Sequence, residues 1–169
     1  YIDPNKGVIY EVDLNGHISW KYKIPNEIVD RGRLRRGADI EWIEGADHFL
    51  FIIPQGGIYE VNRQKEIVWS YQTKYVSHDA DRLPNGNTIF VNAWDSKGDN
   101  QVVEITPEGK VVFDWKISDS EVSCDHSSAD CNRQHGNKSE YTHVNGIQKF
   151  KDGKLRSLII SEEYKFWKI

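Results

Sequence analysis

Gly57-Ile58-Tyr59-Glu60-Val61-Asn62 leads through a short polar turn to Glu66-Ile67-Val68-Trp69, and this pattern occurs three times in the chain. The other two copies have the same aliphatic run, glutamate and closing tryptophan; they span 7–20 and 101–115. The aligned glutamates Glu11, Glu60 and Glu104 are 49 and 44 residues apart. Such a period is typical of stacked four-stranded units, as in the blades of a β-propeller.

Each copy has the pattern of a β-hairpin, with two alternating strands joined by a polar turn. Hairpins of a second type are expected at 38–54, 78–93 and 143–161, and no helix-period segment with caps is evident. One hairpin of each type makes a four-stranded antiparallel sheet of about 45 residues. Such a sheet buries little by itself, so the sheets must stack on one another around an axis.

The sequence therefore predicts an all-β propeller segment of about three blades. We expect a half-blade at 1–25, blades at 38–73 and 78–117, a loop insertion at 118–141 and a half-blade at 142–169. Closed rings have ~4–8 blades, so the remaining blades of an expected six-bladed ring come from a longer parent chain or another subunit. The chain opens at Tyr1 in mid-repeat and has no Met, which indicates that the start of the gene product lies upstream.

Composition narrows the classes of partner. The formal charge is -4, and the cationic run at 31–36 is interpreted as a solvated loop, so nucleic-acid binding is not expected. No stretch approaches the ~18 apolar residues needed to span a bilayer. Trp20, Trp69 and Trp115 recur once per blade, which predicts packing between blades.

Two histidines precede equivalent strands. His78 begins His78-Asp79-Ala80-Asp81-Arg82-Leu83-Pro84-Asn85-Gly86-Asn87-Thr88, and His143 lies in Thr142-His143-Val144-Asn145-Gly146. In a propeller the first strand of each blade lines the central channel, so the two side chains can converge on one axial site. The alternative is that each histidine only caps its strand.

These two histidine motifs, together with the repeated hairpins, resemble the arylsulfotransferase family of six-bladed propellers. More broadly, the hairpins are similar to quinoprotein-like repeats. The resemblance covers nearly the whole chain. It implies sulfuryl transfer between phenols through a sulfohistidine, independent of 3′-phosphoadenylyl sulfate and of any cofactor or metal. The partners it implies are a phenolic sulfate donor and a phenol acceptor.

Residue by residue, the resemblance places the nucleophile at His143, and His78 would assist with sulfuryl binding or proton transfer. Asn145 and Asn92 would donate hydrogen bonds around the channel. The family also holds sulfate with an arginine that follows the first channel histidine. Phe90-Val91-Asn92-Ala93-Trp94-Asp95 contains none, so Arg82 is the substrate-binding candidate, with Arg133 also nearby in sequence.

The insertion contains two cysteines. Cys124 and Cys131 enclose six residues, a spacing suited to a loop disulfide, and the family tends to place a small disulfide loop before the nucleophile. A zinc or copper site is the alternative, with ligands from His126, His135, Asp125 and Asp130. A disulfide and the glycosylation sequon at Asn137 predict a secreted, periplasmic or cell-surface protein.

Two other function classes are open. A non-catalytic extracellular propeller would serve as a structural or protein-binding module. A quinoprotein-like dehydrogenase is less favoured, because the vicinal cysteines and dense carboxylates expected around the quinone are not seen in the sequence.

Overall fold

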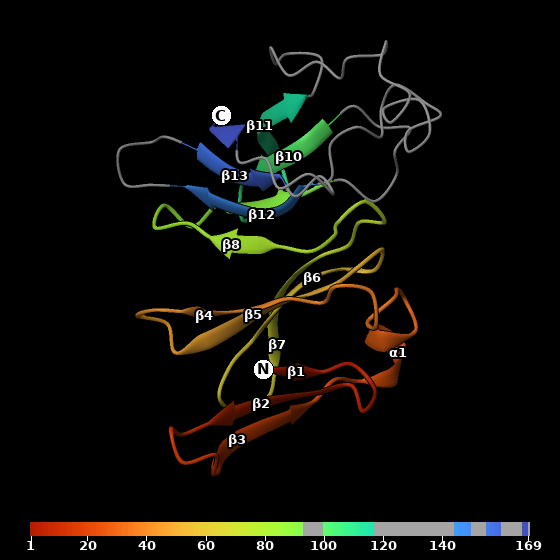
Figure 1. Ribbon diagram of the computed structural model, residues 1–169, viewed down its shortest axis with the longest axis vertical. Coiled ribbons are helices and arrows are strands. Elements are labelled where there is room, and N and C mark those ends of the chain that lie inside the picture. Colours follow the sequence, from red (N-terminus) through yellow and green to blue (C-terminus); the bar gives the residue numbers. More distant parts are fainter. Residues whose placement is uncertain (93–99, 117–143, 150–154, 160–166, 169) are drawn as a thin grey trace.

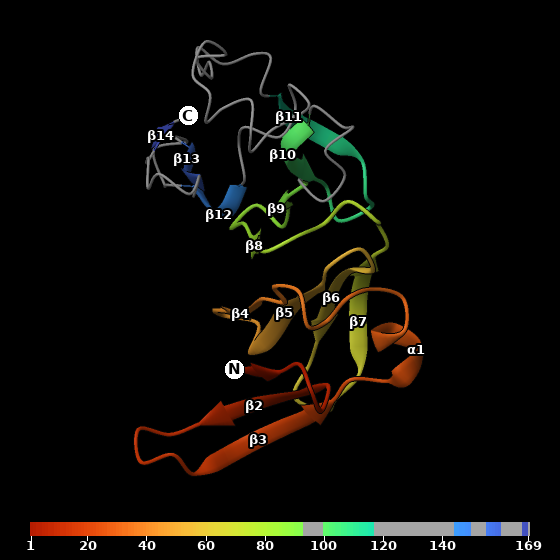
Figure 2. The ribbon, with the colours of Figure 1, turned by 45° about the vertical axis from the view of Figure 1, so that its right-hand side comes forward.

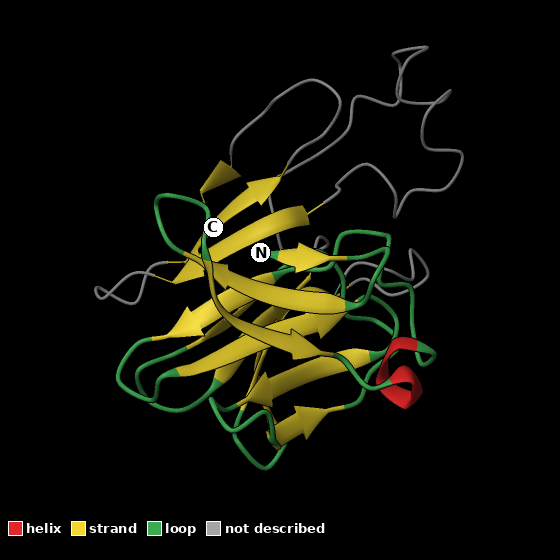
Figure 3. Ribbon diagram, turned by 90° about the horizontal axis from the view of Figure 1, so that it is seen from below, coloured by secondary structure: helices red, strands yellow, loops and turns green. Residues whose placement is uncertain are grey.

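The computed structural model describes residues 1–92, 100–116, 144–149, 155–159 and 167–168. It is all-β, and α1 (Asn26–Val29) is the only helix in this described part of the chain. Figure 3 shows that helix at the edge of the molecule, and strands and loops make up the rest of the described residues. No helix within those ranges is long and apolar enough to cross a membrane.

The strands form four antiparallel sheets that follow one another along the chain. The two complete sheets have four strands each in the order β4-β5-β6-β7 and β8-β9-β10-β11. Their bounds are β4 Ile40–Ile43, β5 His48–Ile53, β6 Gly57–Val61, β7 Ile67–Tyr71, β8 Ala80–Arg82, β9 Thr88–Val91, β10 Asn100–Ile105 and β11 Val111–Lys116. This is the architecture of propeller blades predicted from the repeat.

A three-stranded sheet stands on either side of this pair. The first contains β1 (Ile2–Asp3), β2 (Val8–Val12) and β3 (Ile18–Lys23), and the last contains β12 (Val144–Lys149), β13 (Leu155–Ile159) and β14 (Trp167–Lys168). Figure 2 shows the first three sheets as successive layers, with β12–β14 beside β8 and β9. The contacts of β8 with β4 and β12 bring the first strands of neighbouring blades together.

The repeated hairpins have one turn geometry. In each hairpin the turn closes on its fourth residue, which has positive φ: Gly16 (85°), Lys65 (71°) and Gly109 (83°). A register shift also follows each aligned glutamate, at Glu11/Val12, Glu60/Val61 and Glu104/Ile105. A tight turn with a left-handed residue next to a bulge is a common way to join twisted strands. The hairpins that repeat in sequence therefore also repeat the same turn and the same register shift.

β5 shows why the blades stack. Its side chains alternate between two cores: Phe49, Phe51 and Ile53 pack toward the first sheet, and Leu50 and Ile52 pack toward the β8–β11 sheet. The strand is an unbroken apolar run because a sheet covered on both faces has no solvent face to make polar. Stacking on both sides is thus required by the sequence.

Two of the three blade-end tryptophans, Trp20 and Trp69, join neighbouring sheets, as predicted. Trp20 Nε1 donates to the carbonyl of Arg63 at 3.1 Å, and Trp69 Nε1 donates to the carbonyl of Pro107 at 2.7 Å. Both acceptors lie in the last turn of the following blade. Trp20 also stacks on Phe49 with ring centroids 4.8 Å apart. At each of these two junctions, one tryptophan side chain therefore supplies both apolar contact area and a directional hydrogen bond.

Candidate functional site

His78 lies in a strained turn at the start of the innermost strand of its blade. The N–H of Asp79 donates to the carbonyl of Ser77 at 2.7 Å, closing a three-residue turn in which His78 has φ 60°. A γ-turn with positive φ at its centre is the rarer and more strained of the two γ forms. The Ser77 N–H also donates to the Val91 carbonyl at 3.0 Å, which ties the turn to β9. Strain of this kind at a candidate site is a pointer to function.

Gly37, from the segment that precedes β4, lies against the His78 ring. A Cβ added at Gly37 would come 2.3 Å from Nδ1 and 2.8 Å from Cε1 of His78. Such approaches are too short for any real side chain, and Gly37 itself has φ 85°. The preceding blade therefore helps to hold the imidazole through a contact that only glycine permits.

Asp39 and Asp79 occupy equivalent positions in neighbouring blades. The carbonyl of Asp39 accepts from Ile52 N–H and that of Asp79 accepts from Val91 N–H, both at 3.0 Å. Their carboxyl groups share a hydrogen bond with each other. Asp79 Oδ2 also accepts from the N–H of Ile147 in β12 at 2.7 Å. Asp79 therefore connects the first strands of three successive sheets.

Two further carboxyl groups follow on the same strands, Glu41 on β4 and Asp81 on β8. Glu41 Oε2 accepts from the backbone N–H of Arg82 at 2.9 Å, a second link between the two blades. Among the residues described, no group of three or more His, Cys, Asp or Glu side chains is arranged to hold a metal ion. Asp39, Glu41, Asp79 and Asp81 together are called the channel carboxyls below, after the axial channel that the sequence predicts.

The channel carboxyls are poised to hold protons near neutral pH. Burial raises the pKa of Asp79 to about 7, against the opposing effect of the Ile147 N–H, and the charges of Asp81 and Asp39 raise it further. Burial raises the pKa of Asp81 to about 7 as well, helped by the charges of Glu41 and Asp39. Burial is also the largest cause that raises the pKa values of Asp39 and Glu41. Four carboxyl groups this close cannot all ionise without strong mutual repulsion.

The structure brings part of the predicted site together. Asn92 follows directly after β9, whose last residue accepts the Ser77 N–H, so it lies at the same end of the blade as His78. Asn145 lies in β12, two residues before Ile147, whose N–H binds Asp79. His143 lies outside the described residues, and β12 begins at the next residue. Cys124, Cys131, Asn137 and Arg133 also lie outside them, as do the alternative metal ligands.

Arg82 lies at the opposite end of β8 and is already engaged. Its guanidinium donates to Glu60 Oε2 at 2.7 Å and to the Gly86 carbonyl at 3.0 Å, and it lies over Trp69 at 4.3 Å from the ring centroid. Its side chain is only 10% exposed. These contacts give Arg82 a structural role between blades, at the end of the strand away from His78.

The channel carboxyls were not among the residues that sequence reasoning selected. Asp39-Ile40-Glu41 and Asp79-Ala80-Asp81 carry acidic residues two apart at the start of equivalent strands, which places both side chains on one face. That repeated spacing is the sequence feature from which the channel carboxyls could have been predicted. The proximity of the two pairs across the blade junction follows only from the stacking.

Comparison with known proteins identifies the family. A solved structure of a protein of unknown function from Bacteroides caccae is similar in fold, with a TM-score of 0.53 and 14% identity over 96% of this chain. The chain spans 54% of that protein, about half its length. Comparison with curated proteins gives no match. The family described as Arylsulfotransferase (ASST) matches residues 3–165, almost the entire sequence. The chain therefore belongs to the arylsulfotransferase family.

Proposed function

We propose that this protein transfers a sulfuryl group between phenolic compounds, with His143 as the nucleophile. Family membership over residues 3–165 is the observation that carries the proposal. An imidazole nitrogen of His143 attacks the sulfur of an aryl sulfate, and the sulfur–oxygen bond to the departing phenolate breaks. The acceptor phenol then loses its proton, and its oxygen attacks the sulfohistidine and releases the imidazole. Such a nucleophile accelerates the reaction because it divides one difficult transfer into two easier steps.

His78 is proposed to hold the transferred group or to receive the phenol proton. Its strained turn and its contact with Gly37 support this role, because they fix the ring before any substrate arrives. Asn92 and Asn145 are proposed as hydrogen-bond donors at the same end of the channel. Arg82 is left out of the proposed sulfate site, since Glu60 already neutralises it.

The channel carboxyls give the proposal a pH dependence. Asp79 directly follows His78, and both Asp79 and Asp81 have pKa values raised to about 7. Below pH 7 they are largely neutral and tolerate an aryl sulfate anion nearby. As Asp79 and Asp81 ionise, they become negatively charged and repel that anion. The KM for an aryl sulfate is therefore expected to rise above pH 7.

The decisive experiment incubates the protein with 4-nitrophenyl sulfate and excess phenol, following nitrophenolate release and the intact mass. We expect release, together with a covalent sulfuryl adduct that is missing in His143→Asn. His78→Asn is expected to slow turnover by about 10²-fold or more. His17→Asn is the matched control, since that side chain is 79% exposed in the β2–β3 turn.

A non-catalytic binding or structural propeller is the second candidate. The observation that favours it is the engagement of Arg82 by Glu60 and Trp69, which removes one predicted sulfate donor. Absence of release and of adduct across a panel of phenols, in folded protein, would establish this candidate instead.

The proposed location is outside the cytosol: secreted, periplasmic or cell-surface. It rests on the Cys124–Cys131 pair and on the Asn137 sequon. Peptide mapping without reduction tests it, since a linked pair supports export and two free thiols contradict it. The proposal also includes a six-bladed ring, completed by the parent chain or another subunit, which the mass of the assembled protein will test.

A further inference from the structure

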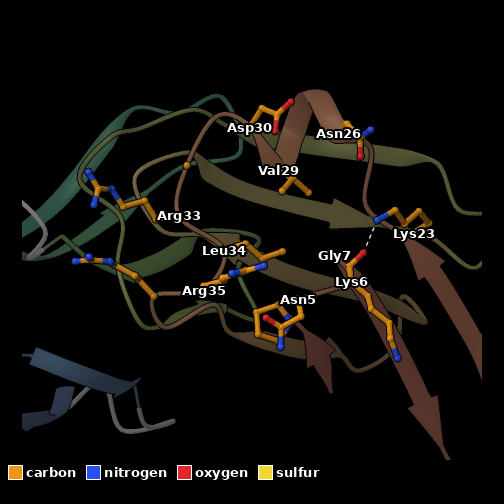
Figure 4. Close-up of a pocket in the computed structure, with 13 residues that line it drawn as sticks. Asn5, Lys6, Gly7, Lys23, Asn26, Val29, Asp30, Arg33, Leu34 and Arg35 are labelled. Atoms are coloured by element: carbon orange, nitrogen blue, oxygen red, sulfur yellow. Dashed lines mark hydrogen bonds between the residues drawn. The ribbon is translucent and has the colours of Figure 1, made fainter.

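A cavity of about 670 Å³ lies between the β1–β2 turn and the segment that joins β3 to β4. Five of its lining residues are cationic and one is acidic: Lys6, Lys23, Arg33, Arg35 and Arg36 against Asp30. Figure 4 shows Arg35 between Leu34 and Asn5, with Lys23 and Asn26 on the opposite side of the cavity. This concentration of positive charge occurs in a chain whose formal charge is -4. The cavity that these five cationic residues line is called the basic cavity below.

The walls of the basic cavity are held by the fold. On one side, Asp3 Oδ1 accepts from the N–H groups of Asn5 and Lys6 at 3.0 and 3.1 Å, which shapes the β1–β2 turn. On the other side, the Arg33 N–H donates to the Pro54 carbonyl at 2.7 Å, and Leu34 is buried in the core. Because Leu34 anchors this segment, the flanking arginines are presented at the surface on a fixed backbone.

Most of the positive charge of the basic cavity has no carboxylate partner among the residues that the structure describes. Lys6 has Asp3 at 3.5 Å, and Lys23 donates to the Lys6 carbonyl. No carboxylate in the described ranges lies within ion-pair distance of Arg33, Arg35 or Arg36. By contrast, Arg63 and Arg82 each bind a carboxylate at 2.6–2.7 Å. Like charges held close together without counter-charges raise the free energy of the folded state, and a bound anion relieves that cost.

We propose that the basic cavity binds a compact polyanion carrying two or more sulfate or phosphate ester groups. Guanidinium groups match the tetrahedral oxyanions of both esters through paired N–H donors. All five cationic residues are exposed, and a single ion pair at an exposed site contributes little. Useful affinity therefore requires a ligand that engages several of them at once.

His78 does not line the basic cavity, but a segment of the cavity wall leads directly to the residue that contacts His78. Arg36 directly precedes Gly37, where an added Cβ would meet the His78 ring. The β1–β2 turn and the segment before β4 also lie at the blade end that corresponds to the His78 turn, because antiparallel strands alternate in direction. A polyanion held here lies next to the segment that contacts His78, yet its binding requires no catalysis.

The test is calorimetric titration of the protein with myo-inositol hexakisphosphate and myo-inositol hexasulfate, which differ only in the ester. We expect both to bind and the affinity to fall as salt is added. A tighter hexasulfate identifies sulfate esters as the natural chemistry, and a tighter hexakisphosphate identifies phosphate esters. Inorganic sulfate alone is expected to bind at least tenfold more weakly than either.

The variant Arg33→Gln/Arg35→Gln is compared with Lys21→Gln/Lys110→Gln, which removes the same charge from exposed sites elsewhere. The first pair is expected to weaken binding at least tenfold and the second less than threefold. Equal losses in both variants, or no binding of either inositol ester, would overturn the proposal. Because binding is measured directly, this result is independent of whether the protein transfers sulfuryl groups.

Discussion

Gly37 and His78 are in contact across a blade junction, and a Cβ at Gly37 would come 2.3 Å from the imidazole Nδ1. One blade thus fixes the orientation of a candidate catalytic side chain on the next. Neither residue type alone indicates this, because the contact joins two segments about 40 residues apart in sequence.

Gly37→Ala tests this contact. The new methyl group must displace the His78 ring, so we expect turnover of 4-nitrophenyl sulfate to fall at least tenfold. Gly37 also has φ 85°, and an alanine there costs about 1–2 kcal/mol of strain. Gly16→Ala is the control, since it has the same φ of 85° with nothing within 4 Å of its Cβ. Equal turnover in the two variants would show that the contact does not position His78.

Asp79→Asn tests the protonation of the channel carboxyls. The pKa of Asp79 is raised from 3.8 to about 7, so the folded protein binds more protons than the unfolded chain between those values. The contribution of Asp79 to the stability of the wild type therefore falls as the pH rises from about 4 to 7. Asparagine keeps an oxygen acceptor for the Ile147 N–H but carries no charge.

Thermal unfolding of Asp79→Asn at pH 5 and pH 8 measures this effect. The variant is expected to lose less stability than the wild type between the two conditions. Asp30→Asn, at an exposed position beside α1, should retain the wild-type difference. A variant whose pH dependence matches the wild type would mean that Asp79 is ionised throughout.

Glu60→Gln tests the structural role assigned to Arg82. Removing the carboxylate leaves a nearly buried guanidinium without its counter-charge, at a cost of about 2 kcal/mol in the free energy of unfolding. The double variant Glu60→Gln/Arg82→Gln should be less destabilised than the sum of the singles, because each single variant already breaks the Glu60–Arg82 pair. Urea titration gives these values, with Glu44→Gln in an exposed turn as the control. If the losses of the two single variants add up to the loss of the double variant, Glu60 and Arg82 do not stabilise the protein through each other.

Trp69→Phe tests the hydrogen bond between blades. The variant keeps an aromatic ring but loses the Nε1 donor to the Pro107 carbonyl, so we expect a loss of about 1–2 kcal/mol. Trp42→Phe provides the comparison, because the Trp42 indole is 47% exposed. If both variants unfold at the same urea concentration, the junction bond contributes nothing measurable.

Lys65→Gly is predicted to stabilise the protein. Lys65 occupies the left-handed turn position where the other repeats have glycine, with φ 71°. Relief of the steric cost, less the entropy of a more flexible unfolded chain, leaves a gain of about 0.5–1 kcal/mol. The reciprocal Gly16→Lys should lose a similar amount. A lower unfolding midpoint for Lys65→Gly would contradict this reading of the turn.

The blade architecture could be predicted from the amino-acid sequence. The period of Glu11, Glu60 and Glu104 and the alternation of apolar residues depend on local backbone geometry, which every copy repeats. The closing tryptophans were predicted to pack between blades, and Trp20 and Trp69 do so with a directional bond. The family resemblance was likewise recognisable in the motifs around His78 and His143, and the family match confirms it.

Tertiary structure alone decided which side chains meet across the blade junctions. Arg82 lies close to His78 in sequence, yet β8 places it at the far end of the strand, beside Glu60 of the preceding blade. Asp39 and Asp79 are 40 residues apart in sequence but share a hydrogen bond, which neither local motif predicts. The physical reason is that strand periodicity specifies the face on which a side chain lies. The partner on that face depends on how the sheets stack.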